Sequence, residues 1–311
     1  MGLLCIQPHF LKFRSMREFT INKNDSGQRI DRFITKLMPA LPQSMLYKGL
    51  RKNCVKLNGK HIKDGSVFVK EGDVVNLYFS DEFFESKSSF NYVRADIDVV
   101  YEDDNIIIVN KPSGVIAHSD TKNAQTTLID MIKSYLYDNG EYDEKAENSF
   151  SPSLCNRLDR NTAGLVIAAK NAAALRDMNA RIRNREVRKF YTAQVEGTPP
   201  QSGHLEGYAV RDRMVTSITE KKQDGAKAVS LDYRVTARRS GGATLEIELH
   251  TGRTHQIRAQ LAAVGYPLVG DTKYGGHGAK YRQALRAVRL EFDFSDTDSI
   301  LGYLSGKKIK L

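Results

Sequence analysis

The order of apolar and polar residues between positions 27 and 79 predicts two helices followed by a small sheet. Apolar side chains recur every three or four positions over residues 30–41, which is the spacing of an amphipathic helix. A second, shorter helix is expected after Ser44. The stretch CVKLNGKHI then alternates about Asn58-Gly59, a dipeptide typical of a tight hairpin turn. Two more strands are expected on either side of residues 71–73.

Strand patterns dominate the longer stretch from residue 96 onward. Short apolar runs such as Leu165–Ala169 and alternating segments such as ATLEIELHTGR are typical of strands. Helical spacing is expected over residues 125–137, after Asn171 and after Thr254, where the polar residue can cap the helix. We therefore predict an α+β fold with a mixed, largely antiparallel sheet and flanking helices.

A polar stretch without periodicity, SDEFFESKSSFNYVRA, separates the two regions and is typical of a linker. The predicted organisation is a tail over residues 1–17, a small domain over 18–80, a linker over 81–95 and a larger domain over 96–311. Within the larger domain, residues 138–151 are a polar excursion in which we expect no core face.

Composition and charge point to a polyanionic partner. The 311 residues are 41% hydrophobic and 27% charged, as in ordinary globular proteins, but the net charge is +10. Nucleic acid is the first candidate partner and an anionic membrane surface the second. No apolar stretch approaches the ~20 residues of a membrane-spanning helix. Because Cys5, Cys54 and Cys155 lack metal or disulfide spacing, we expect a reduced, cytoplasmic protein. We also expect a monomer.

One short stretch, LCNRLDRNTAGLVIAAK, places a carboxylate between two guanidiniums at the start of a buried strand. Asp159 follows Arg157 by two residues and immediately precedes Arg160. Most such clusters are solvated ion pairs on a surface. The alternative is an ionised nucleophile or base that neighbouring cations keep charged.

The sequence lacks the motifs of the common cofactor and metal enzymes. There is no GxxxxGK[ST] loop, no GxGxxG opening a helix, no HExxH and no GxSxG elbow. His250 and His255 are five residues apart with no acidic cluster beside them, so a structural or RNA-facing role is favoured over metal ligation. We therefore expect no metal and no cofactor, and acid–base chemistry on a nucleic acid.

Basic side chains gather on the second helix of the small domain and on the strand after it. The motifs RIDRFI, SMLYKGLRKNCVKLNGK and VKEGDVV in this region resemble an S4 RNA-binding domain over residues 27–79. S4 domains contact RNA mainly through backbone charge and shape. The alternative is an ordinary solvated surface. The side chains expected to bind RNA are Lys48, Arg51, Lys52 and Lys56.

Three ordered motifs in the larger domain resemble RNA pseudouridine synthases of the RluA type, which commonly carry an S4 domain. They are NRLDRNTAGLVIAAK, VRKFYTAQV and LHTGRTHQIRAQLAAVGYPLVGDTKYG, and YEDDNIIIVNKPSGVIAH matches the opening strand and turn of that family. The resemblance runs from about residue 96 to 292. It implies isomerisation of uridine to pseudouridine without a cofactor.

The resemblance also assigns roles to individual residues. It implies that Asp159 is the catalytic aspartate, that Tyr191 packs against the target base and that Arg253 pairs with the aspartate. A base must leave its stack to reach such a carboxylate, so an aromatic platform is physically reasonable. Further contacts to RNA are expected from Arg157, Arg160, His255 and Arg258.

Two positions depart from the pattern of that family, since Asn156 stands where histidine is common and Ala163 where serine is common. Asparagine keeps a donor and an acceptor but does not titrate near neutrality, and we expect activity to survive.

Ribosomal RNA of the large subunit is the favoured substrate over transfer RNA. Two alternatives are a non-catalytic RNA-binding or ribosome-associated protein, and a glycosidase-like nucleoside hydrolase, although no second positioned carboxylate lies in the motifs.

Overall fold

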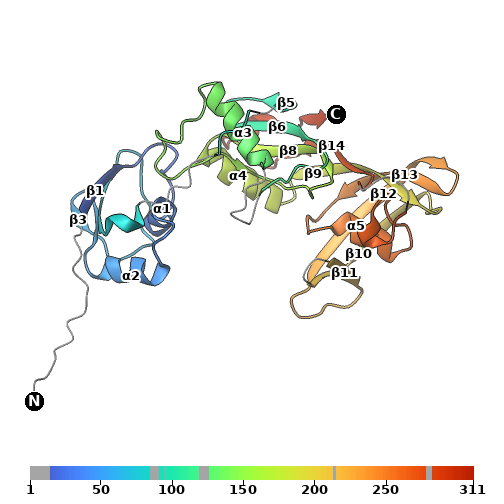
Figure 1. Ribbon diagram of the computed structural model, residues 1–311, viewed down its shortest axis with the longest axis horizontal. Helices are drawn as coiled ribbons and strands as arrows, with labels where there is room; N and C mark the ends of the chain where they lie inside the picture. The colour runs from blue at the N-terminus through green and yellow to red at the C-terminus, as the bar shows by residue number, and fades with distance from the viewer. Residues whose placement is uncertain (1–14, 85–90, 95, 119–125, 213–214, 278–281) are drawn as a thin grey trace, which may run out of the picture. The chain divides into compact units, whose positions relative to one another are not determined.

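A computed structural model describes residues 15–84, 91–94, 96–118, 126–212, 215–277 and 282–311. The chain divides into two compact units. The first comprises Met1–Phe90 with Asp143–Ser151, and the second comprises Asn91–Tyr142 with Pro152–Leu311. Figure 1 shows both units, coloured along the chain. Among the described residues, no helix is long and apolar enough to cross a membrane.

The first unit is a four-stranded antiparallel sheet with two helices, in the strand order β1-β4-β2-β3. Its elements are β1 (Ser15–Thr20), α1 (Ile30–Leu37), α2 (Gln43–Arg51), β2 (Val55–Leu57), β3 (Lys60–His61), β4 (Val74–Phe79) and the 3-10 turn η1 (Asp81–Phe83). The apolar faces of α1 and α2 supply much of the core, as their spacing predicts. The hairpin turn at Asn58-Gly59 is also confirmed, with φ of 50° and 78° at its two residues.

The limits of this unit differ from the prediction at both ends. The first strand begins at Ser15 and pairs with β4, so residues 15–17 belong to the sheet and not to a tail. The first residues of the expected linker also belong to this unit, because Asp81 accepts hydrogen bonds from Ser15 and Arg17. Residues 1–14 and 85–90 lie outside the described part of the chain.

Residues 143–151, which we call the strap, complete the first unit although they come from the middle of the chain. Asp25 is fully buried, and its carboxylate accepts hydrogen bonds from the side chains of Asn148 and Ser149. The side-chain nitrogen of Asn148 lies 2.7 Å from the carboxylate oxygen. The prediction that this segment has no core face is wrong, because Phe150 is buried. The polar residues of the strap pair with a buried carboxylate instead of water, and hydropathy cannot show that.

The second unit is built on one long sheet in the order β11-β10-β12-β13-β9-β14-β8-β6-β5 (Figure 1). Among the described strands, β8 and β14 form the parallel pair and the other pairs are antiparallel, which confirms the predicted fold class. The strands are β5 (Val99–Glu102), β6 (Ile106–Lys111), β7 (Ser153–Leu154), β8 (Ala163–Ala169), β9 (Val187–Glu196), β10 (Ser202–Asp212), β11 (Val215–Thr219), β12 (Lys227–Arg239), β13 (Gly242–Leu249), β14 (Leu285–Phe292) and β15 (Lys308–Lys310). The helices are α3 (Leu128–Asp138), α4 (Ala172–Arg183) and α5 (Gln256–Ala263).

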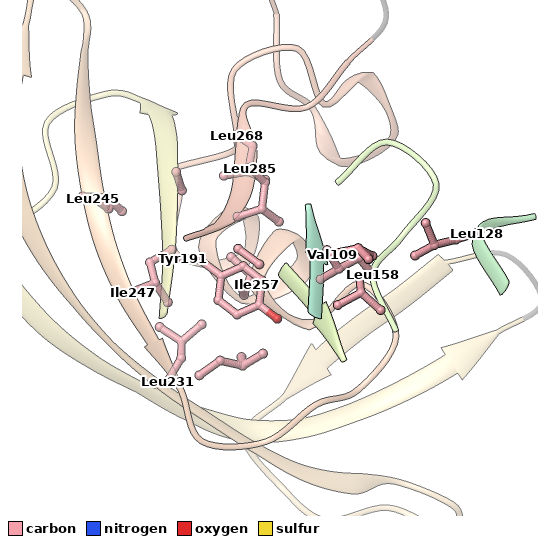
Figure 2. Packing of buried hydrophobic residues seen from close by; sticks show 14 of the residues in the cluster. Val109, Leu128, Leu158, Tyr191, Leu231, Leu245, Ile247, Ile257, Leu268 and Leu285 are labelled. Atoms are coloured by element: carbon pink, nitrogen blue, oxygen red, sulfur yellow. The ribbon is translucent and has the colours of Figure 1, made fainter. Parts of the chain in front are cut away.

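Two apolar cores lie on opposite faces of the central strands. In β8, Val166 belongs to the core that includes α3 and α5, whereas Leu165 and Ile167 belong to the core that includes α4. Because both faces of this strand are covered, its sequence is a continuous apolar run. Figure 2 shows the first of these cores, in which Tyr191 lies among Leu231, Ile257 and other apolar side chains.

The parallel contact between β8 and β14 requires a glycine five residues after Asp159. Gly164 has a φ of 115°, and a Cβ placed there would lie 2.1 Å from the carbonyl oxygen of Ala287 in β14. This close approach fixes the start of β8, and with it the turn that precedes the strand.

Helix capping is as predicted for α4 and different for α5. The side chain of Asn171 accepts a hydrogen bond from the backbone of Ala174, 2.8 Å away, at the start of α4. The expected cap at Thr254 is wrong, because the residue before α5 is His255, in the left-handed conformation with φ of 55°.

Candidate active site

A cleft of about 710 Å³ lies in the second unit. Much of its wall comes from three segments: the residues between β7 and β8, the start of β9, and the loop between β13 and α5. Each of the three motifs identified in the larger domain contributes one of these segments. The structure therefore gathers around one cavity residues that are far apart in sequence, such as Asp159 and Arg258.

Asp159 lies in a tight turn in this cleft, with its side chain 25% exposed. Its own carbonyl oxygen accepts a hydrogen bond from the backbone of Thr162, 3.0 Å away. The carbonyl of the next residue, Arg160, accepts from the backbone of Gly114 at 2.8 Å. The turn is thereby fixed from both sides, and the carboxylate is held at a defined position.

The partner of Asp159 is Arg258, in the first turn of α5. A guanidinium nitrogen of Arg258 lies 3.2 Å from Asp159, and two others donate to Asp271 at 2.7 and 2.8 Å. Both Arg258 and Asp271 are buried. Burial alone lowers the pKa of Arg258, but the bonds to Asp271 and Asp159 outweigh it and raise that pKa. A permanent cation is therefore locked beside the aspartate.

This arrangement corrects two expectations about the last motif. Arg253 was expected to pair with Asp159, but it is exposed on the loop before α5, and the guanidinium that contacts Asp159 among the described residues is that of Arg258. Arg258 was expected to bind RNA, but its donors are directed at two carboxylates inside the protein. The motif has two arginines five residues apart, and the start of α5 decides which of them faces inward.

His255 also faces the aspartate, with Nε2 3.8 Å from the Asp159 carboxylate. Burial lowers its pKa, which favours the neutral imidazole at neutral pH. The hydroxyl of Tyr274 accepts from the backbone of Thr216 at 2.9 Å and lies 3.0 Å from His255 Nδ1. The hydroxyl can therefore donate its own proton to Nδ1, which leaves the proton of Nε2 directed at Asp159.

Tyr191, on β9, combines the two roles considered for it. It lines the cleft and is at the same time a member of the apolar core, 5% exposed, among Leu231, Ile247 and Ile257 (Figure 2). Burial, together with the nearby charge of Asp159, raises the pKa of its hydroxyl. The ring is a rigid, neutral surface in the cavity, which suits stacking or packing against a base.

Lys111 is a site residue that sequence reasoning missed. It is completely buried at the end of β6, and its ammonium donates to the carbonyl oxygens of Pro112, Val115 and Arg160 at 3.0, 2.8 and 3.0 Å. Burial lowers its pKa to about 8, and the charge of Asp159 acts in the opposite direction. The signal in the sequence was the NKPSG turn, but nothing in it shows that the lysine faces inward to hold the Asp159 turn.

The mouth of the cleft is basic. Arg157 and Arg160, the sequence neighbours of Asp159, are exposed there, and among the described residues no ion pair joins either of them to Asp159. Further basic side chains that line the cleft include Arg183, Arg185, Lys189, Arg211 and Arg253. Such a rim attracts the phosphates of a nucleic acid.

Asn156, which replaces the histidine common in the family, is used structurally. Its side-chain oxygen accepts a hydrogen bond from the backbone of Ile167 in β8, 2.8 Å away. The side chain therefore fastens the segment before Asp159 to the edge of β8, and the position needs no proton transfer for that purpose.

In the first unit, three of the four basic residues expected to contact RNA are exposed on or directly after α2. These are Lys48, Arg51 and Lys52. Lys56, on β2, is only half-buried, and its ammonium lies 5.4 Å from the centroid of the Tyr78 ring. We call these four residues the S4 basic face.

Comparison with known families agrees with this geometry. The RNA pseudouridylate synthase family matches residues 105–263, and the S4 domain family matches residues 28–75. The chain therefore belongs to the RNA pseudouridine synthases, as an RluA-type enzyme with an N-terminal S4 domain. The alternative of a non-catalytic RNA-binding protein is set aside by this result.

Individual relatives match over most of their length. An RNA pseudouridine synthase of Mycoplasma capricolum is 32% identical over 302 residues, which cover 94% of this chain and 97% of the relative. Ribosomal large subunit pseudouridine synthase D of Vibrio cholerae is 29% identical over 299 residues, covering 91% and 89% of the two chains. The solved human RNA pseudouridylate synthase domain containing 1 is 23% identical, covers 66% of this chain and 81% of its own, and has a TM-score of 0.52, which shows the fold.

Proposed function

We propose that this pseudouridine synthase modifies uridine in large-subunit ribosomal RNA, with Asp159 as the acting carboxylate and no cofactor. Two observations support the choice of substrate. Similar proteins from Vibrio cholerae and Buchnera aphidicola are ribosomal large subunit pseudouridine synthases. The chain also has two separate basic surfaces, the S4 basic face and the mouth of the cleft, which suits a large folded RNA.

The observation that carries the proposed mechanism is the group formed by Asp159, Arg258 and His255. A carboxylate that attacks a sugar or a base must be anionic, although burial disfavours its charge. Arg258 at 3.2 Å offsets that cost, and Asp271 holds the guanidinium in place. His255 Nε2, 3.8 Å from the carboxylate, is a second polar group beside the anion.

The isomerisation balances without an external reagent. The bond from N1 of uracil to the ribose C1′ breaks, the base turns, and C5 bonds to C1′; the C5 proton is lost to solvent and N1 takes up a proton. The target nucleotide must be flipped out of its stack to reach Asp159. Tyr191 supplies the flat wall against which the turning base packs, and the basic rim holds the flanking phosphates.

The test is Asp159→Asn, which keeps the size of the side chain and removes its charge. Tritium release from RNA containing 5-tritiated uridine should fall by at least about a thousandfold, because no neighbouring residue can replace the anion. RNA affinity should be nearly unchanged, since the phosphate contacts remain. The matched control is Asp104→Asn, in an exposed turn outside the cleft. A variant at position 159 that turns over like the control would reduce Asp159 to part of a surface ion-pair cluster.

The substrate is tested separately. Pseudouridines can be mapped by chemical adduct sequencing in total RNA from cells with and without the gene. We expect at least one site to disappear from large-subunit ribosomal RNA. Loss confined to transfer RNA would contradict the choice of substrate while leaving the role of Asp159 in place.

A further inference from the structure

Three side chains that commonly ligate metals meet on the outer face of the sheet, outside the group around Asp159. His204 lies on β10, Asp232 on β12 and His250 directly after β13. His204 Nδ1 is 2.6 Å from one oxygen of Asp232, and His250 Nε2 is 2.8 Å from the other. One ligand atom from each residue lies within 4.8 Å of the other two.

The sheet itself brings these residues together. His204 and Asp232 are direct cross-strand partners, and the backbone of His250 donates to the carbonyl of Ser230, two residues before Asp232. Alternate residues of a strand face opposite sides, and the neighbours Leu205, Leu231 and Leu249 all face the core. The three polar side chains therefore project together on the other side, where they are 29% to 51% exposed and open to ions from solution.

We propose that His204, Asp232 and His250 bind a divalent transition-metal ion, with zinc as the best fit. Two imidazole nitrogens and one carboxylate oxygen form a common zinc ligand set, and water completes the tetrahedron. Magnesium and calcium are disfavoured because they prefer oxygen ligands. The site lies outside the group that acts on uridine, so we assign the ion no part in the isomerisation itself.

The surroundings of His204 support this assignment. Its second ring nitrogen, Nε2, lies 3.7 Å from a carboxylate oxygen of Glu206. When Nδ1 binds a metal, Nε2 carries the proton, and a carboxylate beside that nitrogen fixes the ring orientation and makes the ligand more basic. Glu206 and Asp232 also provide negative charge that attracts a cation to a protein whose net charge is +10.

The ion would connect the cleft to the sheet. His250 is the first residue of the loop that carries Arg253 and His255, and it lines the cleft. Coordination would fasten this end of the loop to β10 and β12. The same end is already held by Thr251, whose hydroxyl oxygen accepts from the backbone of Ser230 at 3.0 Å.

The test is a zinc titration of the full chain, prepared metal-free and without an affinity tag, in competition with a chromophoric chelator. Wild-type protein should bind about one zinc ion per chain, and His204→Ala and His250→Ala should each weaken binding by at least about a hundredfold. Cobalt should bind in the same place and give the intense visible absorption of a four-coordinate site. The matched control is His277→Ala, which removes a histidine paired with one carboxylate, Glu196, and should leave zinc binding unchanged.

Two further variants distinguish a metal site from a simple hydrogen-bonded network. Asp232→Asn keeps a hydrogen-bonding side chain but loses the anionic ligand, so zinc binding should be lost. Glu206→Gln should weaken zinc binding by about tenfold, because the ring of His204 loses the carboxylate that orients it. Absence of zinc binding by the wild-type protein, or wild-type zinc affinity in either histidine variant, would overturn the proposal. Thermal unfolding of each variant without metal checks that the fold is intact.

Discussion

The arginine that faces Asp159 provides the sharpest test of the active-site geometry. Arg258→Lys keeps the positive charge but replaces a planar group with several donors by a single ammonium. The arginine makes three charge-assisted hydrogen bonds, one to Asp159 and two to Asp271, and a lysine cannot reach both carboxylates in that geometry. We therefore expect the bond to Asp159 to be lost or badly strained.

The magnitude follows from these contacts. A hydrogen bond to a charged group contributes about 1.5–3 kcal/mol, so the rate of pseudouridine formation should fall by about 10- to 150-fold. The free energy of unfolding should also fall, by about 2–4 kcal/mol, because the buried Asp271 loses its bidentate partner. RNA affinity should change little, since Arg258 is buried and directs its donors inward.

The assay is single-turnover tritium release with saturating enzyme, alongside urea unfolding and an RNA-binding titration. Arg253→Lys is the matched control, since it makes the same chemical change on the exposed loop five residues earlier. This variant should keep its rate within about threefold, because the charge at the mouth of the cleft remains. If Arg253→Lys lost more activity than Arg258→Lys, our assignment of the aspartate's partner would be refuted.

Four further outcomes are expected. Lys111→Met should lower the free energy of unfolding by about 2–4 kcal/mol in chemical denaturation, because three carbonyl oxygens lose their donor. The pKa of Lys111 is lowered to about 8, so the unfolded chain binds this proton more tightly than the folded protein does. The contribution of Lys111 to the free energy of unfolding, measured as the difference between wild type and Lys111→Met, should therefore rise between pH 8 and about 10.5. A fall over this range would contradict the burial of its charge. Asn156→His should change turnover by less than about tenfold, since the side chain holds β8; a larger gain in tritium release would show that the position takes part in proton transfer. Replacing the S4 basic face with alanines should reduce the salt dependence of RNA binding by about two to three in log–log slope, and an unchanged slope would make this face an ordinary surface.

The sequence predicts elements well where neighbouring residues decide the outcome. The hairpin at Asn58-Gly59, the cap at Asn171 and the buried strand after Asp159 all depend on local backbone chemistry and apolar period, and all are present. The cleft is also consistent with the motifs, because Asp159 and Tyr191 both line it. Their catalytic roles remain predictions until the variants are measured.

The remaining features depend on contacts between distant residues. Whether Arg253 or Arg258 faces Asp159 is decided by where α5 begins, and the left-handed conformation of His255 moves that start past the apparent cap. The inward direction of Lys111 depends on a turn that folds over it. The group of His204, Asp232 and His250 spans three strands, so no short spacing in the sequence reveals it.

The strap has a consequence for how the protein is made. Because Asn148 and Ser149 hold the buried carboxylate of Asp25, the first unit cannot fold completely until residue 151 has left the ribosome. By then more than fifty residues of the larger unit have already been synthesised, so folding cannot proceed strictly from the first unit to the second. A fragment cut at the end of η1 would leave Asp25 without these two donors, and the excised domain would be less stable than the same residues in the full chain.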